Sequence, residues 1–109
     1  MKKLITVLLT AMLLVAGSAH ATVMDGNEFL QIYNRSDAIS IHYLRGYIGG
    51  TLDQYEITQP ELTKCLGTQV KMSQLVDAVA LYLQANPQVR HYHPSTFIPL
   101  SIKKQFSCN

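Results

Sequence analysis

Apolar side chains recur at spacings of three and four residues through most of the chain after residue 21, which is the pattern of amphipathic α-helices. The longest such pattern runs from Asp37 to about Ile57, and its apolar face consists of Ile41, Leu44, Ile48, Leu52 and Tyr55. The most regular pattern ends at Asn86-Pro87, because proline cannot continue the helical hydrogen bonds, and its face consists of Met72, Leu75, Val76, Val79, Ala80 and Leu83. No segment shows the sustained alternation of apolar and polar residues that is typical of a strand.

Shorter helices are predicted on either side of these two. Asp25-Gly26-Asn27-Glu28 has the form of a capping box, in which an acceptor side chain at the N-cap is followed three residues later by a carboxylate. Ser95 can cap a last helix, and we expect Pro99 to delay its regular hydrogen bonding; its apolar residues are Phe97, Leu100, Ile102 and Phe106. Thr58 to Val70 contains a proline and a glycine and is predicted to be a loop between two helices. The expected fold is therefore all-α, a small bundle of four helices.

The first 21 residues have a different character. Lys2 and Lys3 precede an apolar run from Leu4 to Ala16, and the segment ends in Ala19-His20-Ala21, which has the small-x-small form of a cleavage site. The apolar run is shorter than the roughly 20 residues of a membrane-spanning helix. We predict a signal peptide over residues 1–21, which leaves one exported domain over residues 22–109 that is not inserted in the membrane. A retained signal anchor is the alternative.

Cleavage would change the charge balance of the chain. The 109 residues include nine Lys and Arg against seven Asp and Glu, and removal of Lys2 and Lys3 leaves a domain without net charge. A neutral domain gives no electrostatic reason to expect nucleic acid or an anionic membrane as the partner. Its two cysteines, Cys65 and Cys108, are predicted to form a disulfide, because an oxidising compartment favours the bond and a small core gains from it. Two buried free thiols are the alternative.

Three glycines lie inside the longest predicted helix, at Gly46, Gly49 and Gly50. Each costs up to about 1 kcal/mol relative to alanine in a helix interior, so the positions require another explanation. We expect them to allow close packing within the chain, and contact with a second subunit is the alternative.

His91-Tyr92-His93 is the only cluster with the residue types of a chemical site. Alternate histidines can bind a metal when a third ligand is near, but these lie in a predicted loop between Pro87 and Pro94 and no cysteine is free to join them. The chain also lacks a nucleophile motif and a Gly-rich phosphate loop. We therefore predict no metal, no cofactor and no enzymatic activity.

The loop from Asn86 to Pro94 is instead the candidate binding surface, held in place by the disulfide-closed segment around it. Its two prolines restrict it, and it offers arginine and tyrosine, which protein interfaces favour. A preorganised loop loses less entropy when it binds. An ordinary helix connector is the alternative; the residues predicted to contact a partner are Gln88, Arg90, His91, Tyr92 and His93.

Segments spread over most of the chain resemble those of the small periplasmic immunity proteins of the Rap/Tai type, which protect bacteria from type VI secretion effectors. The matching segments are Asp25 to Leu30, Gly46 to Gly50, Cys65, Ser73 to Val79, Tyr82-Leu83, Asn86-Pro87, Arg90-His91 and Phe106 to Cys108. The resemblance implies an all-helical homodimer in the periplasm that binds a peptidoglycan amidase effector and blocks its active site. Relatives often have a second cysteine pair joining the first two helices, where this chain has Tyr33 and Tyr43-Leu44.

A small periplasmic acid-stress chaperone is the alternative function. Such a protein also has one disulfide and works by exposing apolar surface at low pH. Only His42, His91, His93 and the seven carboxylates could respond to that change, and a neutral domain has no obvious acid trigger. The immunity function is therefore favoured.

Overall fold

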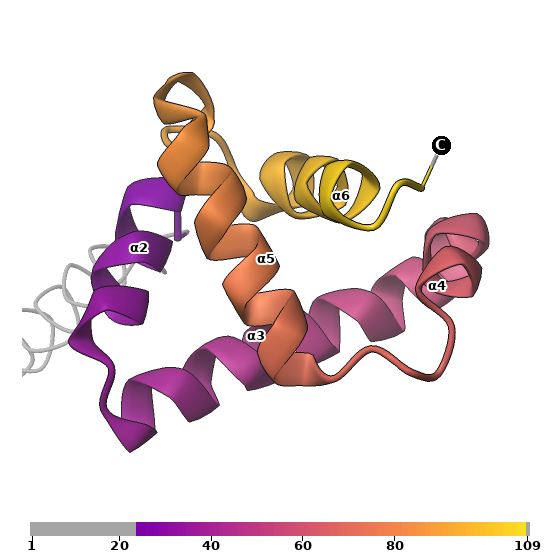
Figure 1. Ribbon diagram of the computed structural model, residues 1–109, viewed down its shortest axis with the longest axis horizontal. Coiled ribbons are helices and arrows are strands. Elements are labelled where there is room, and N and C mark those ends of the chain that lie inside the picture. Colours follow the sequence, from indigo (N-terminus) through magenta and orange to yellow (C-terminus); the bar gives the residue numbers. More distant parts are fainter. Residues whose placement is uncertain (1–23, 109) are drawn as a thin grey trace, which may run out of the picture.

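The computed structural model describes residues 24–108, which form five α-helices and one turn of 3-10 helix (Figure 1). The elements are α2 (Gly26–Arg35), α3 (Ala38–Thr58), α4 (Pro60–Leu66), α5 (Met72–Ala85), η1 (Pro87–Val89) and α6 (Pro94–Gln105). This part of the chain contains no strand, so the predicted all-α class is confirmed, but the number of α-helices is five rather than four. The predicted signal peptide over residues 1–21 lies outside the described residues.

The additional helix, α4, lies in the segment that was predicted to be a loop. Pro60 occupies its first turn, where the missing N–H of proline has no helical partner to lose. Gly67 ends the helix with a backbone φ of 66°, a conformation that favours glycine. Leu62 and Leu66 are buried, one turn apart. The prediction of a loop was wrong because the proline and the glycine mark the two ends of a short helix.

The starts of α2 and α3 follow the sequence signals. Asp25 accepts a hydrogen bond from Glu28 N at 2.9 Å, and Asp37 accepts one from Ser40 N at 2.7 Å. The backbone and hydroxyl hydrogen bonds from Ser40 hold the pKa of Asp37 below its ordinary value. At α5 the cap is weaker, because Lys71 makes no side-chain capping hydrogen bond.

The start of α6 differs from the prediction. His93 is the N-cap, and its Nδ1 accepts a hydrogen bond from Ser95 N at 3.0 Å, so Ser95 is not the capping residue. Pro94 then occupies the first helical position, where its fixed φ suits a helix. Pro99 lies buried inside α6 and does not delay its start. One missing N–H therefore interrupts the helical hydrogen bonds without ending the helix.

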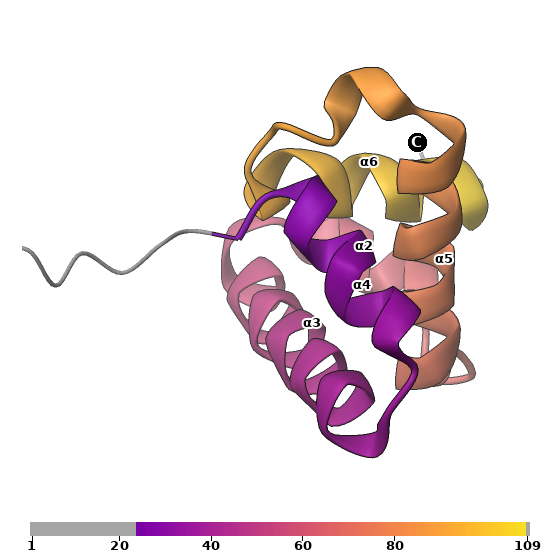
Figure 2. The ribbon, with the colours of Figure 1, turned by 90° about the vertical axis from the view of Figure 1, so that its left-hand side faces the viewer.

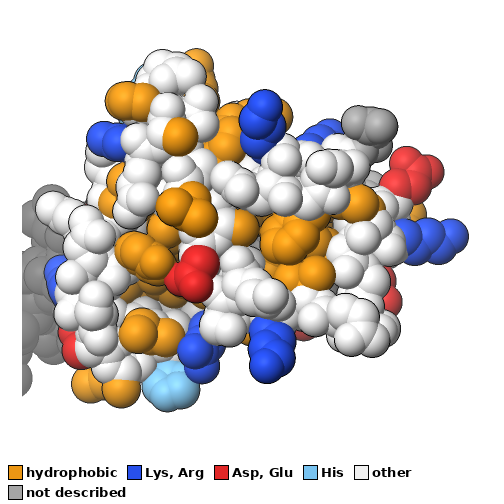
Figure 3. Space-filling view, viewed as in Figure 1, with side chains coloured by type: hydrophobic (Ala, Val, Ile, Leu, Met, Phe, Trp, Pro, Cys, Tyr) orange, Lys and Arg blue, Asp and Glu red, His pale blue; other side chains and the backbone are white. Residues whose placement is uncertain are grey.

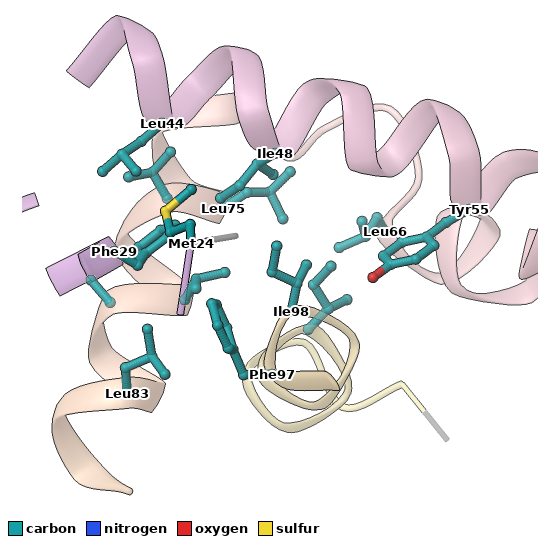
Figure 4. Close-up of a cluster of buried hydrophobic side chains, with 14 of the residues drawn as sticks. Met24, Phe29, Leu44, Ile48, Tyr55, Leu66, Leu75, Leu83, Phe97 and Ile98 are labelled. Carbon is teal, nitrogen blue, oxygen red and sulfur yellow. The ribbon is translucent and has the colours of Figure 1, made fainter. Parts of the chain in front are cut away.

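The core forms where α5 packs against α6, α3 and α2 (Figure 1). Figure 2 shows α2 lying between α3 and α5, with α6 across one end. The rings of Phe29 and Phe97 meet edge to face, with 6.0 Å between their centroids, and join α2 to α6 (Figure 4). The predicted apolar faces of α3 and α5 point into this core, except that Ile41 lies outside it, in the wall of a surface pocket. Its fully buried large side chains include Phe29, Leu44, Ile48, Val79, Leu83, Phe97, Ile98 and Ile102.

The predicted disulfide is present, and one of its cysteines, Cys108, is buried at the edge of α6 as part of the core cluster. Cys65 lies in α4 and Cys108 follows α6, with 5.9 Å between their Cα atoms. Neither of the two cysteines is free. The bond therefore attaches the short helix α4 to the segment that follows α6.

Candidate functional site

The connecting loop, residues 86–93, joins α5 to α6 and protrudes at one end of the molecule (Figures 1 and 2). It begins with η1 and continues through a turn to the N-cap of α6. Gln88, His91, Tyr92 and His93 are exposed, as a binding surface requires. The rings of His91 and Tyr92 lie together with 4.4 Å between their centroids. The loop thus presents a paired aromatic surface to solvent.

Arg90 has a different position from its exposed neighbours, because its side chain turns back onto α5. Its Nε donates to Leu83 O at 2.7 Å, and one Nη donates to Gln84 O at 2.8 Å. Carbonyls in the last turn of a helix lack helical partners, so the guanidinium supplies hydrogen bonds that α5 would otherwise lack. The predicted contact of Arg90 with a partner is not tested by this geometry. The side chain does hold the loop against the helix.

The backbone of Arg90 is also fixed, by the start of α2. Its carbonyl accepts a hydrogen bond from Asn27 N at 3.0 Å. A Cβ atom on Gly26 would lie 2.8 Å from both Cα and O of Arg90 and 2.8 Å from a methyl carbon of Leu83. Only glycine allows the two backbones to approach this closely. Gly26 is therefore part of the site, although the sequence indicated only its place in a capping box.

Polar side chains secure the two ends of the loop. Asn86 Nδ2 donates to Tyr82 O at 2.8 Å, and His93 caps α6 through Nδ1. Of the five residues predicted to contact a partner, three have side-chain hydrogen bonds within the fold: Arg90, His93 and Gln88, whose Nε2 donates to Asn86 Oδ1 at 3.3 Å. Gln88, His91, Tyr92 and His93 are exposed. This arrangement is preorganised for binding, because the backbone is fixed before a partner arrives.

Gly46 and Gly50 of α3 line a hollow of about 450 Å³ together with His93, Pro94 and Ser95, so two of the three glycines border the connecting loop. A Cβ on Gly49 would contact Met72 Cε at 3.5 Å, whereas a Cβ on Gly46 or Gly50 would meet no atom within 4 Å. The expected close packing within the chain is therefore wrong for Gly46 and Gly50. Contact with a second subunit stays a prediction.

Residues 24–108 contain no group of three or more His, Cys, Asp or Glu side chains arranged to hold a metal ion. Within the same range, no helix is both long enough and apolar enough to cross a membrane.

The fold and the loop define a small, disulfide-bonded helical domain whose exposed connecting loop is fixed by hydrogen bonds at both ends. The family model of the Rap1a immunity proteins matches residues 25–108, and the chain belongs to this family. The resemblance drawn from the sequence is thereby confirmed, and membership implies that the chain binds a protein effector. No curated protein and no solved structure matches the chain.

Proposed function

We propose that the chain is exported to the periplasm, where it binds a peptidoglycan amidase delivered by type VI secretion and inhibits it. Membership in the immunity family supports the inhibitory role. The basic and apolar character of residues 1–21 supports export, and the Cys65–Cys108 disulfide fits an oxidising compartment. In this proposal the chain has no catalytic role.

The observation that carries the proposal is the rigid connecting loop. His91 and Tyr92 enter the substrate cleft of the amidase, while Arg90 and Gly26 fix the loop from behind. Tyrosine buries a large surface with little loss of side-chain freedom, and it can place a hydroxyl among the polar groups of a cleft. The loop then excludes substrate by filling the cleft, and no chemical reaction between the two proteins is needed.

Inhibition is proposed to occur in a homodimer formed through the outer face of α3. Ile39 and Ile57 are 84% and 80% exposed, and they lie 18 residues apart, which is five helical turns. Gly46 and Gly50 lie between them with open space above each Cα. A second copy packed antiparallel would place each Ile39 near the partner's Ile57 and bring the two helices close at the glycines. Sedimentation equilibrium should give a dimer for the natural chain and a monomer for Gly50→Arg; a natural chain that stays monomeric at high micromolar concentration would exclude this interface.

The inhibitory role is tested with a secreted amidase encoded beside this chain. Tyr92→Ala should weaken binding roughly thirtyfold, the effect of losing an interface hot spot of about 2 kcal/mol, with a matching loss of inhibition. Leu81→Ala is the matched control, because Leu81 is 55% exposed and lies in α5, outside the loop. Binding by calorimetry, amidase activity and rescue of cells that express the amidase in the periplasm are measured together. The proposal fails if the natural chain neither binds nor rescues.

A further inference from the structure

A second polar site lies between α2, α3 and α5, on the face drawn in Figure 3. It is a hollow of about 230 Å³, and acidic and basic side chains lie beside apolar ones on this face. Ile41 and Val76 form part of its wall, and its polar lining consists of Tyr33, Ser36, Arg45, Ser73 and Asp77. None of these residues belongs to the connecting loop.

Arg45 is the principal cation of this pocket. It lies on the side of α3 that faces α5, where it is partly buried. Its Nε is enclosed and has no hydrogen-bond partner among the described residues. An enclosed donor without an acceptor costs free energy, and a guanidinium is shaped to receive the two oxygens of a carboxylate. The side chain is therefore placed to bind an anion that enters the pocket.

The groups around Arg45 also favour the binding of an anion. Ser73 lies in the first turn of α5, and that turn carries the positive end of a helix dipole, with no capping side chain from Lys71. Asp77 is the one group in the pocket that opposes an anion, and its Oδ1 accepts a hydrogen bond from the Tyr33 hydroxyl at 2.9 Å. Burial first, and then Asp77, raises the pKa of Tyr33, so the hydroxyl stays protonated and remains a donor to Asp77. One carboxylate is thus already engaged, whereas Arg45 Nε has no hydrogen-bond partner among the described residues.

We propose that this pocket binds a carboxylate, with Arg45 as the main contact and the Ser73 hydroxyl as a second donor. The carboxylate can belong to a small free acid or to an acidic side chain of a protein partner. The pocket lies beside the first half of α5, where Ser73, Val76 and Asp77 line it, and the connecting loop follows the end of this helix. From Asp77 to Ala85 the helix rises by about 12 Å. The site is therefore separate from the loop, and its binding of a carboxylate does not depend on the proposed immunity function.

A titration of the oxidised protein with sodium acetate tests the site. The titration is monitored by nitrogen-15 NMR at the Arg45 Nε–Hε group and the Ser73 amide. Sodium chloride at equal ionic strength is the reference. Acetate should shift both resonances in a saturable manner that chloride does not reproduce. Arg45→Gln should weaken acetate binding at least about tenfold, the loss expected for a charge-assisted hydrogen bond, while Arg35→Gln on the exposed end of α2 should not.

Asp77→Asn gives a second test that does not remove the cation. The substitution removes the opposing charge from the pocket and should tighten acetate binding severalfold. Equal shifts with chloride, unchanged binding in Arg45→Gln, or weaker binding in Asp77→Asn would each overturn the proposal. Melting temperatures of the variants show whether each remains folded.

Affinity for the amidase, measured in Arg45→Gln, shows whether the carboxylate belongs to a protein partner or to a small free acid. If Arg45→Gln lowers affinity for the amidase while the loop is intact, the pocket receives an acidic side chain of that protein. If amidase affinity is unchanged and acetate binding is lost, the pocket receives a free carboxylate. A failure of the immunity function would leave the acetate result standing, because that measurement needs no effector.

Discussion

Replacement of Gly26 by alanine should separate the start of α2 from the connecting loop. The added methyl group would lie 2.8 Å from two backbone atoms of Arg90, whereas ordinary contacts begin at 3.4 Å. Because backbone atoms cannot rotate away as a side chain would, the two segments must move apart by roughly half an ångström, and such overpacking costs about 1–3 kcal/mol. The hydrogen bond from Asn27 N to Arg90 O is strained by the same movement, and its full loss would add about 1 kcal/mol.

Chemical unfolding followed by circular dichroism measures this cost, with Gly50→Ala as the matched control. Gly50 has no atom within 4 Å of the added Cβ, so its replacement should stabilise α3 by up to about 1 kcal/mol. Both variants are measured at a concentration at which the chain is monomeric, because Gly50 also lies on the proposed dimer face. The two glycines should therefore shift the free energy of unfolding in opposite directions, and Gly26→Ala should also weaken binding to the effector. Equal or greater stability of Gly26→Ala would refute the proposed role of this contact.

Other changes test separate parts of the structure. Tyr55→Phe should stabilise the chain by about 1 kcal/mol, because the buried Tyr55 hydroxyl has no hydrogen-bond partner among the described residues. Tyr33→Phe should destabilise the chain, because it removes a hydroxyl that donates to Asp77. Urea unfolding that ranks the two variants in the reverse order would contradict this. Arg90→Ala should lower stability by about 1–3 kcal/mol through the loss of two charge-assisted hydrogen bonds, while Tyr92→Ala should stay within about 0.5 kcal/mol of the natural chain, both read from thermal unfolding. Cys65→Ser, which opens a link across 43 residues, should cost about 4 kcal/mol, and equal melting temperatures with and without a reducing agent would count against that value.

The long helices could be predicted because their apolar residues repeat with the helical period over many turns. Leu44 and Ile48 in α3, like Val79 and Leu83 in α5, are buried as their spacing requires. The same reasoning failed for α4, which has too few turns for a period to stand out, and whose end residues Pro60 and Gly67 are equally typical of loops.

The sequence indicated the connecting loop as the candidate site but not the contacts that hold the loop in place. Two prolines and the mixture of aromatic and basic residues pointed to the connecting loop. The side chain of Arg90 bonds to backbone carbonyls, which every residue carries, so no sequence pattern reveals its partners. The close approach at Gly26 likewise joins two segments that are more than 60 residues apart, and a single sequence contains no signal for that contact.

The arrangement also changes the role expected for the disulfide. From the sequence, the cysteines were expected to hold the connecting loop in place. In the structure the bond joins α4 to the end of α6, whereas the loop precedes the start of α6, a helix of 12 residues and about 18 Å in length. The loop is held instead by Arg90, by Asn27 and by the cap at His93. Reduction should therefore lower global stability, and at temperatures where the reduced chain stays folded it should leave effector affinity nearly unchanged. A large loss of affinity in a reduced but folded chain would show that the bond positions the loop after all.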